Sequence, residues 1–237
     1  MASLWFSGFS FSFSFFLICN KMAKFLKKWN PKTLPKREIL YILAPKRSGK
    51  ISLILTLYLD YLERKYDYVI VLAGNPDCAS EYRKILPGKY VHDRYHPDIL
   101  KKFFNASDVL VKKSGKKSLP SVFFILDDTL RMRKTDKTPR TTDDPYIHRL
   151  FTEHRHYNCG LAICTQNIAA GTTSFIRGCD CFLTCPSSLS NGSDIDLIAK
   201  NYMGNQRYWE TNYEILDQFK KFEFLVITQP PGNKRTC

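Results

Sequence analysis

Acidic residues are scarce in this sequence. The resulting excess of positive charge limits the functions that the protein is expected to have. Of 237 residues, 22 are Asp or Glu and 36 are Lys or Arg, which gives a formal net charge of +14. Such an excess favours an anionic partner, usually nucleic acid, although an inert basic surface is an alternative. With 44% hydrophobic residues, the composition excludes a wholly disordered chain, and the length suits one α/β domain.

The sequence also lacks the cysteine spacing of common zinc sites. It has eight cysteines but no CxxC pair. Cys179, Cys181 and Cys185 lie in or beside an expected strand, and Cys159 and Cys164 flank another apolar run. We interpret these residues as buried free thiols in a reducing compartment, with a zinc site as the less favoured alternative.

No charged side chain occurs in residues 1–20, so the segment lacks the basic start of an ordinary signal peptide. Its apolar run is also short for a membrane span. Three interpretations are open: an incorrect start codon upstream of Met22, a membrane-inserting or targeting segment, or a real strand.

Residues 21–37 contain seven basic residues and two prolines, which suits either a solvated linker or a DNA-contacting arm.

A regular alternation of strands and helices begins near residue 38. Short apolar runs predict strands at 38–45, 68–74, 89–93, 121–128, 160–167, 179–186 and 223–229. Apolar residues at helical spacing predict helices at 51–66, 96–113, 145–158, 194–203 and 208–222, and the polar stretch 129–144 is expected to be a loop. This order predicts an α/β fold with a mainly parallel sheet and helices on both faces.

A candidate phosphate-binding loop joins the first expected strand to the first helix. Its residues are Ala44, Pro45, Lys46, Arg47, Ser48, Gly49, Lys50, Ile51 and Ser52. Backbone amides and the positive end of the helix can hold phosphates there, and Lys50 can reach the β- and γ-phosphates. An ordinary strand–loop–helix connection is the alternative.

The loop departs twice from the pattern G-x-x-x-x-G-K-[ST]. Ala44 stands at the first Gly, and Ile51 stands where a hydroxyl should face magnesium. Ser52 is a weak substitute, because one helical step turns it by about 100°. The change at Ile51 therefore puts catalytic efficiency in question.

Two acids end the expected strand at 121–128. Asp127 is a candidate magnesium ligand, and Asp128 is a candidate to orient and deprotonate the attacking water. A buried parallel strand delivers such carboxylates to the edge of the sheet that also carries the phosphate-binding loop. A pair of turn acids is the alternative, although their position after the loop motif fits a nucleotide-binding core.

Further polar residues suit the same chemistry. Gln166, between Thr165 and Asn167, can sense the γ-phosphate from the end of its strand, unless it lies in an ordinary turn. Arg155 is a candidate to reach the γ-phosphate of a neighbouring subunit, with Arg149 and Arg177 as rivals.

Basic residues crowd two loops beside the strand 121–128, and they suit contacts with DNA phosphates or simple solvation. They are Lys112, Lys113, Lys116 and Lys117 in one loop, and Arg131, Arg133, Lys134, Lys137 and Arg140 in the other.

Together these motifs resemble the FtsK–HerA superfamily of pumping ATPases, and most closely its poxvirus-type genome-packaging members. The resemblance covers roughly residues 38–229 and is most specific in ILDD and EHRHYNCGLAICTQN. It implies a RecA-like P-loop core, ATP and Mg²⁺ as cofactors, and a homo-oligomeric ring that moves double-stranded DNA into a capsid. It also implies the phosphate-binding role for Lys50, the acid roles for Asp127 and Asp128, the sensor role for Gln166, and the arginine offered in trans for Arg155.

We therefore expect residues 1–37 to lie outside the core, 38–229 to form the ATPase domain, and 230–237 to be a tail. The resemblance implies a capsid or portal partner and a place in the host-cell cytoplasm, the virus factory or the virion, without secretion. A membrane is expected only if residues 1–20 belong to the protein. Two other functions stay open: another P-loop NTPase, such as a small-molecule kinase or a helicase-like enzyme, and a hydrolysis-deficient nucleotide- or DNA-binding scaffold.

Overall fold

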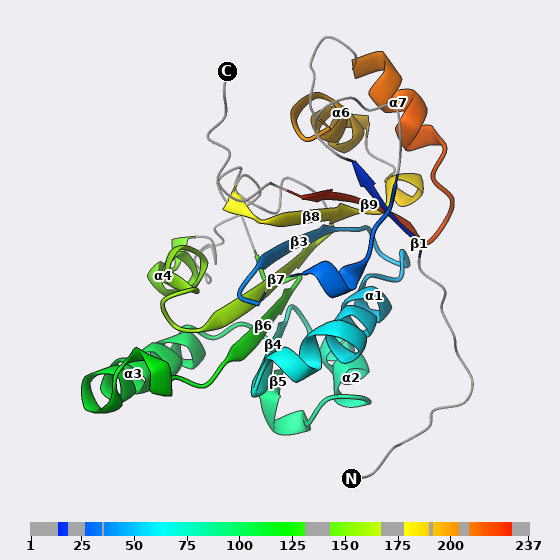
Figure 1. The fold of residues 1–237 in the computed structure, drawn as a ribbon. Coiled ribbons are helices and arrows are strands. Elements are labelled where there is room, and N and C mark those ends of the chain that lie inside the picture. The colour runs from blue at the N-terminus through cyan, green and yellow to red at the C-terminus, as the bar shows by residue number, and fades with distance from the viewer. Residues whose placement is uncertain are drawn as a thin grey trace.

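A computed structural model describes most of the chain as one sheet with helices on both faces (Figure 1). The described residues are 14–18, 27–34, 36–130, 143–166, 178–189, 192–203 and 209–228. The basic stretch 131–142, Asn167, Arg177 and the tail 230–237 therefore lie outside them.

Within these residues, nine strands form a single sheet in the order β2-β1-β9-β8-β3-β7-β6-β4-β5. The strands are β1 (Ser14–Ile18), β2 (Lys27–Lys28), β3 (Ile39–Leu43), β4 (Tyr68–Ala73), β5 (Val91–His92), β6 (Val122–Asp127), β7 (Cys159–Thr165), β8 (Cys181–Thr184) and β9 (Glu223–Thr228). Neighbouring strands are parallel except for the pairs β1–β2 and β8–β9. The predicted strands and the mainly parallel sheet are confirmed.

The central strands are buried on both sides, which explains their continuous apolar sequences. In β3, Tyr41 and Leu43 belong to one hydrophobic cluster, while Leu40 and Ile42 belong to the cluster on the opposite face. Successive side chains of a strand point to opposite faces, so one short apolar run supplies both cores.

The helices are α1 (Lys50–Leu57), α2 (Pro76–Arg83), α3 (Pro97–Ser114), α4 (Pro145–Glu153), α6 (Gly192–Asn201) and α7 (Trp209–Asp217). Helices α1 and α2 cover one face of the sheet, and α3 and α4 cover the other (Figure 1). A π-helical turn, Tyr58–Leu62, extends α1.

Helix α2 is the one helix of this set that the apolar spacing did not predict. Its mean composition is polar, so the apolar signal is weak. Its start is nevertheless encoded, because the Asn75 side chain accepts a hydrogen bond from the Cys78 amide and Pro76 occupies the first turn.

Residues 1–37 were expected to lie outside the core, but those of them that the structure describes take part in the sheet and the core. Strand β1 pairs in parallel with β9, so residues 14–18 form a real strand of the sheet. Trp29 and Leu34 are buried in the cluster beneath α1. Large apolar side chains in this arm gain by leaving water, and packing therefore begins before residue 38.

Among the residues that the structure describes, none of the helices has both the length and the apolar character that a bilayer span requires.

Candidate active site

The loop between β3 and α1 is held in an unusual backbone conformation. Gly49 has a φ of 84° and Arg47 a φ of 64°, both in the left-handed region, which glycine adopts without strain. The buried Ser48 hydroxyl donates a 2.7 Å hydrogen bond to the Pro45 carbonyl oxygen. Within the described residues, the amides of Gly49, Lys50 and Ile51 donate to no protein acceptor, so the start of α1 presents free donors.

Lys50 lies between the two acids that end β6. Its Nζ atom is 3.2 Å from Asp127 Oδ1 and 2.8 Å from Asp128 Oδ1. The Asp127 side chain is fully buried, whereas that of Asp128 is 20% exposed. Burial acts to lower the pKa of Lys50, but the charges of Asp127 and Asp128 outweigh it, so the pKa is raised above its usual value.

The order of the strands explains why these residues meet. Strand β7 lies between β3 and β6, and all three run in the same direction. Their carboxyl ends therefore share one edge of the sheet, where the loop, the acid pair and Gln166 all follow their strands. The expected meeting of Lys50 with the acid pair is observed.

The second acid, Asp128, is in contact with the residue that follows β7. The Gln166 side-chain amide donates a 2.6 Å hydrogen bond to Asp128 Oδ2. Asp128 itself has a φ of 53°, and its amide donates to the Cys164 carbonyl. A Cβ atom on Gly74 would lie 2.4 Å from the Asp128 carbonyl oxygen, so only glycine permits this close approach of β4.

Asp127 is held by Cys78 and Tyr82, two residues that belong to none of the sequence motifs. Its Oδ2 atom accepts hydrogen bonds from Cys78 Sγ at 2.9 Å and from the Tyr82 hydroxyl at 3.0 Å. Burial, followed by the charge of Asp127, raises the pKa of both Cys78 and Tyr82 well above their usual values. Both groups therefore keep the protons that they donate.

The other oxygen of Asp127 bears on whether Mg²⁺ fits the site. Oδ1 is buried, and within the described residues it accepts no hydrogen bond, although Lys50 Nζ lies nearby. A buried carboxylate oxygen whose nearby partner is a cation, Lys50, suits Mg²⁺, which commonly takes one or two carboxylates with water and phosphate. Ile51 packs its side chain against the cluster beneath α1, and no hydrogen bond joins Ser52 to either acid in the described structure. The residues thus fit Mg²⁺ through Asp127, and the residue after Lys50, Ile51, has no hydroxyl to offer.

Arg155 lies at the opposite edge of the sheet, near the amino ends of β3 and β8. Its guanidinium is 2.7 Å from Asp180 Oδ1 and 3.8 Å from Glu38 Oε1, and its side chain is 58% exposed. Burial and the neighbouring Asp180 raise the pKa of Glu38 to about 7. The fold does not bring Arg155 to Lys50 of the same chain.

The rival Arg149 is engaged within its own chain. It forms ion pairs with Asp108 and Glu153, and it lies over the Phe104 ring. Its side chain is 29% exposed, compared with 58% for Arg155.

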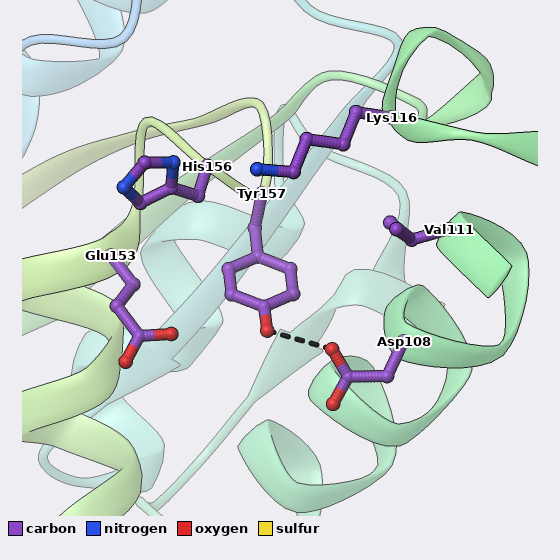
Figure 2. Close-up of a pocket in the computed structure, with 6 residues that line it drawn as sticks. All are labelled: Asp108, Val111, Lys116, Glu153, His156 and Tyr157. Atoms are coloured by element: carbon purple, nitrogen blue, oxygen red, sulfur yellow. Dashed lines mark hydrogen bonds between the residues drawn. The ribbon is translucent and has the colours of Figure 1, made fainter.

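A pocket of about 240 Å³ lies elsewhere, between α3 and the segment that follows α4 (Figure 2). Its lining residues are Asp108, Val111, Lys116, Glu153, His156 and Tyr157. Tyr157 donates a 2.7 Å hydrogen bond to Asp108 across it. The lining includes no residue of the loop or of the acid pair, so this pocket is separate from the candidate active site.

Solved structures of viral packaging proteins share this architecture. The genome packaging NTPase B204 from Sulfolobus turreted icosahedral virus 2, in complex with sulfate, has a TM-score of 0.57 and 20% identity, covering 82% of this chain and 92% of that one. The complex with ATP-gammaS has a TM-score of 0.52 and 20% identity, covering 85% and 99%. The DNA-packaging ATPase B204 from Sulfolobus turreted icosahedral virus has a TM-score of 0.55 and 21% identity, covering 83% and 99%.

The chain has the fold of a P-loop NTPase. The predicted fold class is confirmed by this likeness, which at such identity concerns the fold alone. No protein-family model matches the sequence, and no curated protein matches it either. Within the P-loop NTPase fold, the loop and acid pair described above occupy the carboxyl edge of the sheet, where nucleotides bind in open α/β sheets.

Proposed function

We propose that this protein is an ATP-hydrolysing motor of the FtsK–HerA superfamily that moves double-stranded DNA during viral genome packaging. The main support for this proposal is the contact of Lys50 with both Asp127 and Asp128, at 3.2 and 2.8 Å. The B204 proteins, described as genome-packaging and DNA-packaging enzymes, share the fold and support this proposal. The finer, poxvirus-type assignment rests on the ILDD and EHRHYNCGLAICTQN segments.

The proposed roles follow from charge and position. Lys50 and the free amides at the start of α1 would hold the phosphates of ATP, because both present positive charge to the same space. On binding, Lys50 would exchange its contacts with the carboxylates for contacts with phosphate oxygens. Asp127 would hold Mg²⁺ through Oδ1, and this ion would neutralise charge on the phosphates.

Asp128 is proposed as the general base for the attacking water. It is the more exposed acid, and the hydrogen bond from Gln166 fixes the direction of its carboxylate. Gln166 would in turn sense the γ-phosphate through the same contact.

A homo-oligomeric ring would give Arg155 its role. Because it is exposed at the edge opposite its own Lys50, it is suited to reach the nucleotide of a neighbouring subunit. Exposed lysines at the end of α3 would contact DNA phosphates, and a capsid or portal component would anchor the ring. We propose the host-cell cytoplasm, the virus factory or the virion as its location.

The direct test is ATP hydrolysis by the purified full chain in Mg²⁺, with and without duplex DNA. We expect turnover that rises when duplex DNA is added. Asp128→Asn serves as the control for contaminating ATPases. Absence of turnover under both conditions would contradict the proposed motor.

One observation favours a second function, a nucleotide-binding scaffold without hydrolysis. Ile51 occupies the position of the metal-binding hydroxyl, and its side chain packs against the core cluster. A scaffold would bind ATP and DNA yet release no phosphate, which the same experiment distinguishes when nucleotide binding is measured in parallel.

A further inference from the structure

We propose that Tyr82 and Cys78 are positioning residues that direct Asp127 Oδ1 toward the metal of the nucleotide site. This inference rests on the proposed function, because it assigns the metal-binding step of the same site. Neither residue belongs to the loop motif or to the acid pair.

The two carboxylate oxygens of Asp127 have unequal surroundings. Oδ2 accepts from both the Tyr82 hydroxyl and the Cys78 thiol, at 3.0 and 2.9 Å. Oδ1 accepts no hydrogen bond from the described residues and lies 3.2 Å from Lys50 Nζ. Two neutral donors thus occupy one oxygen and leave the other for a cation.

The burial of Asp127 gives these donors their importance. Its side chain has no exposed surface, so water cannot replace a lost donor at little cost. Without the two hydrogen bonds, the carboxylate could rotate and present either oxygen. Groups that orient a metal ligand in this way usually affect metal affinity by about 10–100-fold.

Helix α2 holds the two donors in place. Cys78 and Tyr82 are four residues apart, so their side chains share one face of the helix. Asn75 caps the helix by accepting from the Cys78 amide at 2.9 Å, and Tyr82 is fully buried. The missing side chain of Gly74 lets the preceding strand approach Asp128 closely, which sets α2 beside the acid pair.

The first variant is Tyr82→Phe, which removes the hydroxyl and keeps the ring. The measurement is the affinity of the full chain for ATPγS as Mg²⁺ is titrated, together with the melting temperature. We expect the Mg²⁺ concentration that gives half of the maximal affinity gain to rise about tenfold. Affinity for ATPγS without Mg²⁺ should stay unchanged.

Tyr66→Phe is the matched control. Tyr66 is a buried tyrosine of the same hydrophobic cluster, and its hydroxyl accepts a hydrogen bond from the Arg37 amide, away from the acids. Both variants lose one hydrogen bond, so both should melt at a lower temperature. Only Tyr82→Phe should shift the Mg²⁺ dependence.

A second pair of variants tests the thiol. Cys78→Ala should shift the Mg²⁺ dependence in the same direction. Cys78→Ser keeps a donor and should restore most of the original Mg²⁺ dependence.

An unchanged Mg²⁺ dependence in both Tyr82→Phe and Cys78→Ala would overturn the inference, as would nucleotide binding by the unmodified chain that is insensitive to Mg²⁺. The proposed motor fails separately, if the unmodified chain shows the expected Mg²⁺ dependence but never hydrolyses ATP.

Discussion

At the scale of single residues, three charged side chains share a small volume beside the phosphate-binding loop. Lys50 offsets part of the charge of Asp127 and Asp128, and the three groups together carry a net negative charge. This arrangement suits a site that later receives Mg²⁺ with ATP, since the metal brings the positive charge that the acids require. It also makes each group sensitive to substitution, because breaking a buried ion pair leaves an uncompensated charge.

Replacement of Asp128 by Asn should abolish hydrolysis and spare ATP binding. The amide cannot accept a proton from water, and loss of a general base lowers turnover by about 10²–10⁴-fold. Steady-state phosphate release and ATPγS affinity measure the two effects. Full activity of Asp128→Asn would remove Asp128 from the catalytic role.

Replacement of Ile51 by Thr should raise turnover markedly, because it supplies the missing hydroxyl at the start of α1. Ile51→Val is the matched control, since Val has the size of Thr and loses the same packing without gaining a hydroxyl. Rates of phosphate release at saturating Mg²⁺ and ATP compare the three proteins. Equal rates for all three would show that Ile51 does not limit the enzyme.

At the scale of elements, β1 determines how the sheet is completed. It pairs with β9 over residues 14–18 and with β2 on its other side, so it links the amino-terminal arm to the carboxyl-terminal strand. A chain that began at Met22 would leave β9 with an unpaired edge.

Deletion of residues 1–21 should therefore lower stability. One hydrogen bond contributes a net of about 0.5–1.5 kcal/mol, so loss of this ladder should cost at least about 2 kcal/mol. That corresponds to about 4–8 °C in melting temperature for a chain of this size. Equal melting of the deleted and full chains would favour the incorrect start codon.

At the scale of the whole molecule, the net charge is +14, and some of the basic residues that produce it are clustered at the end of α3. Lys112, Lys113, Lys116 and Lys117 are all exposed there. Phosphate contacts release counterions, so binding to duplex DNA should weaken steeply as salt rises.

Substitution of Lys116 and Lys117 by Ala should reduce that salt dependence. The slope of log affinity against log salt should fall by about one unit for each lysine that contacts a phosphate. Lys84→Ala with Lys89→Ala removes the same charge from exposed positions near α2 and is the control. Fluorescence anisotropy with labelled duplex DNA measures both slopes. A flat response in the unmodified protein would contradict the phosphate-contact hypothesis.

Much of the fold could be predicted from local sequence patterns, because apolar periodicity and the residue preferences of turns act over a few residues. The strands ending at Leu43 and Asp127 lie within their predicted ranges, and the loop beginning at Ala44 joins a strand to a helix as expected. Helix α2 was missed, since its sequence is polar and only Asn75 and Pro76 mark its start. The amino-terminal arm was assigned outside the core, because strand pairing with β9 has no local signature.

Residue types and their periodicity were enough to predict the class of fold and the kinds of residue at the site: a lysine at a helix start, two acids after a buried strand, and a glutamine after the next strand. The position of Lys50 between the acids, the hydrogen bonds from Tyr82 and Cys78 to Asp127, and the place of Arg155 at the opposite edge became known only from the folded chain. Residue identity and periodicity are local properties, whereas these contacts depend on the order in which distant strands pair within one sheet.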